Sequence, residues 1–183
     1  MNSRIKALIF DFDGLLVNTE ELIKIAYEEF LRRRGKVYDS RDHGKMMGRL
    51  GIENIKYLMK KYKIKGNPEK LYSERREIAK ALYVDKLALM EGVEDLLDLA
   101  EKLGLKCAIG SSGYKEIIEP ALERFGIVEK FSVIVTGGDL DGVKGKPDPQ
   151  IFLITAEMLG IEPTSCLVFE DAPMGVEAAT NAG

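Results

Sequence analysis

The sequence predicts an α/β fold, in which a Rossmann-like parallel sheet carries an inserted α-helical domain. The first observation is a set of short apolar runs without polar alternation, which is typical of buried strands. The second is the helical patterns around the later runs, because strands that alternate with helices form parallel sheets. The third is the long stretch between the first two runs. The predicted strands lie at 5–10, 106–110, 132–137 and 165–170.

Three helices are predicted around the later strands. Their apolar residues recur with helical spacing, and each pattern ends in a glycine, which suits the left-handed backbone just after a helix. These helices lie at 93–104, 114–126 and 149–160. They would serve as the connections of a parallel sheet.

The stretch between the first two strands is several times longer than the dozen or so residues that a crossover needs. Its first helix is expected to begin with Asn18 or Thr19 as N-cap and to end before Gly35. A second helix would start at 52 and a third near 68, with an irregular segment at 41–51. We therefore expect a catalytic core at 1–16 and 89–183, and a helical cap domain at 17–88.

Composition and charge exclude two classes of partner. The formal net charge is −3, so the sequence lacks the excess of basic residues that is typical of a nucleic-acid binder. The basic runs at 32–34 and 60–65 lie among glutamates on predicted helices, which is typical of solvated faces. Asp11 interrupts the N-terminal apolar run too early for a membrane span, so we expect a cytoplasmic protein. His43, the single histidine, is expected at the surface, and no oligomeric state is predicted.

Polar side chains follow each predicted strand at the point where it ends, or lie in the loop beyond it. Ligand sites of open parallel sheets lie outside the carboxyl ends of the strands, so these side chains should converge. They are Asp11, Asp13, Ser111, Ser112, Lys146, Glu170 and Asp171.

Carboxylates crowded at one sheet edge need a cation, and hard oxygen ligands favour magnesium. Beside the ion, Asp11 can be a deprotonated nucleophile, whereas neighbouring negative charge should raise the pKa of Asp13. Gly14 is expected to turn the chain sharply and to bring backbone N–H groups close to an anion. Ser111 would bind a phosphoryl oxygen at the positive end of the following helix.

With these residues, the sequence resembles the haloacid dehalogenase superfamily of aspartate-dependent phosphoryl-transfer enzymes. Its motifs are, in order, "DFDG", Ser111 in "AIGSSG", Lys146 in "GKPDP", and "FEDAPMGVEAA". A lone DxD occurs often by chance, but four motifs with this order and strand context are specific, and the resemblance covers nearly the whole chain. The helical insertion is similar to that of the branch containing phosphoglycolate and sugar-phosphate phosphatases and β-phosphoglucomutase.

The resemblance implies a magnesium-dependent phosphohydrolase for a small phosphorylated metabolite such as a sugar phosphate. Asp11 would attack phosphorus and form an aspartyl-phosphate, while Asp13 would exchange protons with the leaving group and with water. Ser111, Ser112 and Lys146 would bind the transferring phosphoryl group.

The resemblance also implies the metal ligands and the role of the insertion. Magnesium would be held by Asp11, the backbone carbonyl of Asp13, Asp171, and Glu170 through a water molecule. The inserted helices would close over the substrate. Arg49 is a candidate substrate-binding residue, because the loop after the first cap helix often supplies substrate contacts in this branch.

Simpler interpretations exist for several of these residues. Glu170 and Asp171 could cap the next helix, in which Pro173 would occupy an early position. Lys146 could be a solvated loop lysine, and Ser112 an ordinary helix cap.

Two features depart from the family pattern. Asn18 stands where relatives often have aspartate. Relatives also continue with a further strand and helix, so the sheet is expected to lack an edge strand beside 165–170.

Besides hydrolysis, two functions stay open. One is a β-phosphoglucomutase-type phosphosugar mutase, although the first cap helix lacks the histidine of the resembling mutases. The other is a non-catalytic fragment that binds phosphorylated ligands or a partner chain.

Overall fold

The computed structural model describes residues 5–47 and 49–183 and contains a four-stranded parallel sheet. The strand order is β3-β2-β1-β4. The strands are β1 (Ala7–Phe10), β2 (Lys106–Ser111), β3 (Val133–Thr136) and β4 (Cys166–Phe169). All pairings in this sheet are parallel, which confirms the predicted α/β fold.

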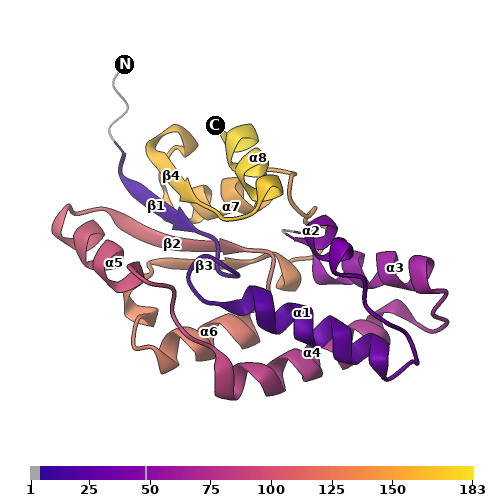
Figure 1. The fold of residues 1–183 in the computed structure, drawn as a ribbon. Coiled ribbons are helices and arrows are strands. Elements are labelled where there is room, and N and C mark those ends of the chain that lie inside the picture. The colour runs from indigo at the N-terminus through magenta and orange to yellow at the C-terminus, as the bar shows by residue number, and fades with distance from the viewer. Residues whose placement is uncertain (1–4, 48) are drawn as a thin grey trace.

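Helices cover both faces of the sheet and bury its apolar side chains (Figure 1). On one face lie α5 (Val93–Lys102) and α6 (Lys115–Arg124). On the other lie α7 (Gln150–Leu159) and α8 (Pro173–Ala182). The glycines after α5, α6 and α7 have φ values of 67°, 68° and 67°, so the predicted left-handed helix ends are confirmed.

The residues between β1 and β2 form a helical insertion with its own hydrophobic cluster. It consists of α1 (Thr19–Arg32), α2 (His43–Met46), α3 (Gly51–Tyr62) and α4 (Pro68–Lys86). The three long helices were predicted. The expected irregular segment at 41–51 instead contains the short helix α2, preceded by one 3-10 turn at Ser40–Asp42.

Two chain segments connect the insertion to the sheet, and they pair with each other. Val17 forms an antiparallel bridge with Leu89. Next to it, the backbone N–H of Asn18 donates to the Ala88 carbonyl over 3.0 Å, and the Ala88 N–H donates to Asn18 Oδ1 over 2.7 Å. Asn18 occupies the N-cap position of α1 but makes no capping hydrogen bond, so its side chain links the two connections instead.

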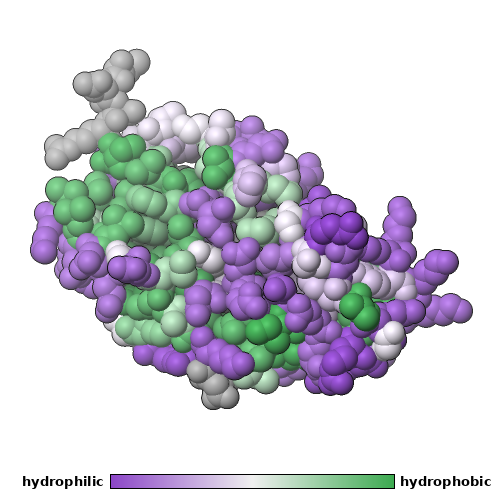
Figure 2. All heavy atoms as spheres, viewed as in Figure 1, coloured by the Kyte–Doolittle hydropathy of each residue, from purple (hydrophilic) through white to green (hydrophobic). Residues whose placement is uncertain are grey.

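Surface composition differs between the two parts of the molecule. In the view of Figure 2, the insertion presents a mainly hydrophilic outer surface. The basic run at 32–34 is partnered by acids, because Arg32 and Arg33 pair with Glu29, and Arg34 pairs with Glu74. This supports the prediction of solvated helix faces.

β4 differs from the expectation of a fully buried strand. It lies at one edge of the described sheet, and its Leu167 is 46% exposed. Edge position explains this exposure, because only one neighbour covers the strand laterally. No helix among the described residues combines the length and the apolar character that a membrane crossing needs.

Candidate active site

The strand register brings the acidic residues of two distant segments together. Phe10 of β1 is paired with Phe169 of β4, so the residues that follow both strands lie side by side. The Asp11 N–H continues this ladder and donates to the Phe169 carbonyl over 3.0 Å. Asp11 therefore lies beside Glu170 and Asp171 at the carboxyl edge of the sheet.

Lys146 is the cation at the centre of this acidic group. Its Nζ donates to Asp11 Oδ1 over 2.7 Å and also contacts Glu170. The residue is 3% exposed, so the interpretation as a solvated loop lysine is wrong. Burial lowers the pKa of Lys146, but Asp11 and Glu170 outweigh burial and raise that pKa above its usual value.

Asp11, Glu170 and Asp171 form a cluster that fits a hard divalent cation. One carboxylate oxygen from each lies within 4.8 Å of the others. Burial first, and then Asp11, raise the pKa of Glu170, although Lys146 opposes this change. Burial, Asp11 and Glu170 raise the pKa of Asp171 to about 6. These groups repel one another, and their oxygen donors are those that magnesium prefers.

Asp13 lies two residues beyond Asp11 and has a pKa of about 6. Burial is the main cause of this rise and the charge of Asp11 adds to it, while a hydrogen bond from Thr19 works in the opposite direction. The direction agrees with the expectation from the sequence. A carboxyl group with this pKa can give up and take up a proton near neutral pH.

Gly14 permits the close approach of Asp171 to the first strand end. Its φ is +80°, and a Cβ atom here would lie 2.3 Å from Asp171 Oδ2. Its N–H donates to the Val17 carbonyl over 2.9 Å and to Thr19 Oγ1 over 3.1 Å. The predicted sharp turn is present. The N–H of Gly14 itself is engaged within the chain, so the predicted contact of backbone N–H groups with an anion would fall to other residues of this loop.

The serines after β2 occupy different positions. Ser111 is 1% exposed, and its Oγ accepts a hydrogen bond of 3.1 Å from the Gly113 N–H. Ser112 lines the cavity described below. Helix α6 begins only at Lys115, so Ser111 is separated from the helix start by a short loop.

The helix-capping interpretation of Glu170 and Asp171 is wrong for α8. Pro173 does occupy the first turn, but no side chain caps the helix. Glu170 Oε2 accepts from the Ala172 N–H over 2.9 Å, which orders the turn before the helix. Gly175 leaves space for this carboxylate, because a Cβ at that position would overlap Glu170.

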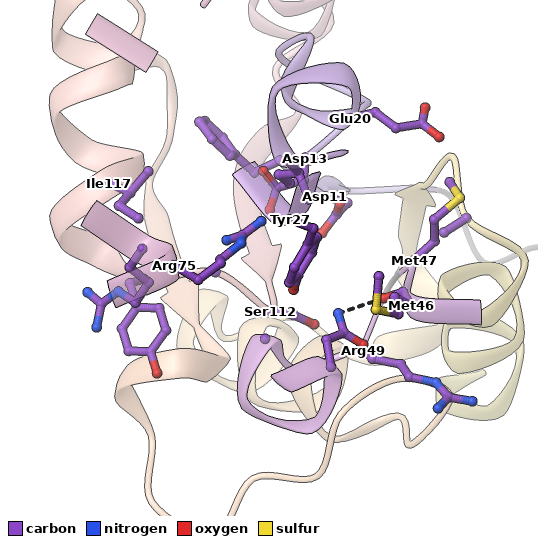
Figure 3. A pocket seen from close by; sticks show the side chains of 18 of the residues that line it. Asp11, Asp13, Glu20, Tyr27, Met46, Met47, Arg49, Arg75, Ser112 and Ile117 are labelled. Carbon is purple, nitrogen blue, oxygen red and sulfur yellow. Dashed lines mark hydrogen bonds between the residues drawn. The ribbon is translucent and has the colours of Figure 1, made fainter. Parts of the chain in front are cut away.

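A cavity of about 130 Å³ lies between this acidic edge and the insertion. Asp11, Asp13, Ser112, Lys146 and Asp171 line it from the sheet side. Figure 3 shows Arg75 extending from the insertion toward Asp13, and its guanidinium lies against the ring of Tyr27, which also lines the cavity. The residues of the sheet and of the insertion thus enclose one shared space.

Arg49 and His43 also contribute to the cavity lining, from the segment before α3. Arg49 is exposed at the rim. The expectation that His43 is a surface residue is wrong, because its side chain is only 16% exposed and its Nε2 lies 3.3 Å from Glu20 Oε1. The short helix α2, which the sequence did not predict, turns His43 inward.

The lining residues that were missed from the sequence include Tyr27, Asn54 and Arg75. A signal existed for Arg75. It lies four residues after Leu71 and three before Ile78, within the apolar stripe of α4. A charged residue in such a stripe is buried against something polar or lines a site.

Fold and site together define an α/β enzyme with an acidic centre beneath a helical insertion. The sequence profile of the haloacid dehalogenase-like hydrolases matches residues 8–183, and the chain belongs to this family. It is 38% identical to the YhcW protein of Bacillus subtilis, over 98% of this chain and 80% of that protein. It is 35% identical to the phosphorylated carbohydrates phosphatase of Thermotoga maritima, over 97% and 82% of the two chains.

Solved structures show the same fold. β-Phosphoglucomutase from Clostridium difficile superposes with a TM-score of 0.86 at 26% identity, covering 97% of this chain and 81% of the other. The described chain is thus a hydrolase of a family that includes phosphatases and mutases.

Proposed function

We propose that the protein is a magnesium-dependent phosphatase that hydrolyses a small phosphomonoester through an aspartyl-phosphate on Asp11. The observation that carries this proposal is the position of Asp11, which contacts Lys146 and lies within 4.8 Å of two further acids. Asp13, with its raised pKa, supplies the proton donor close by.

The metal would be held by Asp11, Asp171 and the backbone carbonyl of Asp13, with Glu170 acting through a water molecule. When bound, magnesium supplies positive charge that offsets the carboxylates and the phosphoryl oxygens. Lys146, Ser111 and Ser112 would bind these oxygens and oppose the charge that grows in the transition state.

In the first step, a carboxylate oxygen of Asp11 forms a bond to phosphorus as the bond to the leaving oxygen breaks. Asp13 donates its proton to that oxygen, so the alcohol leaves neutral and Asp13 becomes a carboxylate. The phosphoryl group is then an acyl phosphate on Asp11.

In the second step, water attacks phosphorus and the bond between phosphorus and the Asp11 oxygen breaks. Asp13 takes the proton of the attacking water, which restores its acid form, and inorganic phosphate leaves. The insertion at 17–88 acts as a cap domain on the core at 1–16 and 89–183, and excludes other water while the substrate is bound.

A phosphorylated sugar is the substrate class that the relatives favour. One relative is a phosphorylated carbohydrates phosphatase, and another, 29% identical, is the fructose-1-phosphate phosphatase of Escherichia coli. Arg49 at the cavity rim is proposed as a contact to the part of the substrate that is not transferred.

Phosphosugar mutase activity is the alternative, favoured by the β-phosphoglucomutases among the relatives. It would use the same aspartyl-phosphate but transfer the phosphoryl group to a second hydroxyl of the sugar. The experiment is incubation with magnesium and a panel of phosphomonoesters that includes β-glucose 1-phosphate, with separate measurement of free phosphate and isomerised sugar.

Release of phosphate without isomer supports the phosphatase. Isomer formation that depends on a bisphosphate primer would contradict the phosphatase and support the mutase. Asp11→Asn should abolish either activity. If the wild-type chain shows neither activity but still binds phosphorylated ligands, the non-catalytic alternative is supported.

A further inference from the structure

Arg75 places a buried guanidinium in the cavity, on the side that the insertion provides. It belongs to α4 and is only 7% exposed. Figure 3 shows its side chain extending toward Asp13. Its guanidinium carbon lies 4.2 Å from the centre of the Tyr27 ring, which fixes the plane of the group and contributes a cation–π interaction.

Within the described residues, Arg75 has no ion pair, in contrast to its neighbours. Arg34 pairs with Glu74, and Arg76, the next residue of α4, pairs with Glu116. The Nε of Arg75 is buried and has no hydrogen-bond partner. Asp13 attracts the guanidinium through space, without a hydrogen bond between the two.

An unpaired guanidinium is unfavourable in this position. Arginine stays protonated at every physiological pH, so Arg75 cannot escape the cost of burial by losing its charge. A neutral partner would satisfy its N–H groups but would add no negative charge to the distant attraction of Asp13. A carboxylate or phosphate does both, because either can accept two parallel hydrogen bonds from the guanidinium.

Asn54 adds an unused acceptor to the same cavity. It is 6% exposed, and its Nδ2 donates to the Met46 carbonyl over 3.0 Å. This hydrogen bond fixes the amide, and its Oδ1 is buried without a hydrogen-bond partner among the described residues. A hydroxyl group is the ligand that could donate to it.

We propose that Arg75 binds a second anionic group, a carboxylate or a phosphate, on the leaving group of the substrate, and that Asn54 accepts a hydrogen bond from a hydroxyl near that group. The inference rests on the proposed phosphatase function. It narrows the substrate class to phosphomonoesters whose alcohol carries an acid. The substrate then supplies the negative partner that Arg75 does not have among the described residues.

The test compares substrates that differ in this acid alone. Phosphoglycolate against 2-hydroxyethyl phosphate tests a carboxylate, and fructose 1,6-bisphosphate against fructose 1-phosphate tests a second phosphate. In at least one pair, kcat/KM of the wild-type protein should be about 10- to 100-fold higher for the acidic member, the range expected of a charge-assisted contact. Equal or lower values for the acidic members of both pairs would overturn the proposal.

Two variants test whether Arg75 causes the preference for acidic substrates. Arg75→Gln should remove most of the preference, so its kcat/KM should fall much further for the acidic member of the pair than for the neutral member. Arg75→Lys keeps the charge but loses the bidentate contact, so it should retain part of the preference. Arg41→Gln, at a side chain that is 86% exposed, is the control and should retain the full preference. An equal loss on acidic and neutral substrates in both Arg75 variants would contradict the proposal.

Binding separates this inference from the proposed function. Calorimetry with Asp11→Asn measures the affinities for phosphoglycolate, 2-hydroxyethyl phosphate and the two fructose phosphates without turnover. Tighter binding of an acidic member by Asp11→Asn, lost in the double variant Asp11→Asn/Arg75→Gln, supports the subsite even if the wild-type protein hydrolyses none of these compounds. Equal binding within both pairs refutes the subsite even if hydrolysis is observed.

Discussion

The charged carboxylates of Asp13 and Asp171 lower the free energy of unfolding of the protein without metal. Burial is the main cause that raises the pKa of each to about 6, and the charge of Asp11 adds to it. An ionised carboxylate in this position is stabilised less than it is in the unfolded chain. The folded protein without metal is therefore less stable while these groups are charged.

The sign of the pH dependence follows from the raised pKa of Asp13. Between about pH 4 and about pH 6 the folded state binds more protons than the unfolded state, so this group lowers the stability as pH rises through that window. Asp13→Asn removes the effect. In the presence of EDTA, the variant should be more stable than the wild type at about pH 8, by on the order of 2 kcal/mol, and the difference should shrink toward about pH 4.

Urea unfolding at both pH values measures this difference. Asp141→Asn, at an exposed position, is the control and should change stability by less than about 0.5 kcal/mol at either pH. A wild-type protein that is more stable than Asp13→Asn at the higher pH would show that the Asp13 carboxylate is favourably paired.

Helix α4 of the insertion is joined to helix α6 of the core by ion pairs. Arg76 and Lys80 of α4 both pair with Glu116 of α6, Lys80 over 3.0 Å. The guanidinium of Arg76 also lies 3.8 Å from the centre of the Tyr114 ring. Glu116 thus joins two cations of the insertion to the core, and under the proposed cap function this contact would favour the closed arrangement.

Glu116→Gln is expected to weaken this contact without affecting the acidic centre. The closed state should be less populated, so KM should rise by about 3- to 10-fold, while stability changes by less than about 1 kcal/mol. Steady-state kinetics and hydrogen exchange in α4 measure both effects. Glu123→Gln, on the exposed surface of α6, is the matched control. Unchanged KM and unchanged exchange in Glu116→Gln would contradict the role of this contact.

Elements with strong local signals were predicted correctly, and those that depend on tertiary packing were not. The glycine-terminated helices α5, α6 and α7 carry their end signals in the sequence. Asn18 has the chemistry of a helix cap, but the neighbouring connection offers the backbone of Ala88 as a competing partner. α2 has a single turn, too short for a periodic pattern.

At the scale of the whole molecule, the sheet register accounts for the convergence of the candidate site. The sequence predicted this convergence from one rule, because all strands of a parallel sheet end at the same edge. The contributions of the insertion to the cavity could not be predicted in the same way. Whether Arg75 or His43 faces the sheet depends on how the helices pack, and neither residue belongs to a motif.

Direct detection of the covalent intermediate tests the central claim. The protein is mixed with magnesium and a phosphomonoester that it hydrolyses, quenched during turnover and treated with borohydride, which reduces an acyl phosphate. Mass spectrometry of the peptides then locates the modified residue. The account predicts modification of Asp11 alone, absent from Asp11→Asn. Modification of another residue, or turnover by Asp11→Asn at the wild-type rate, would contradict it.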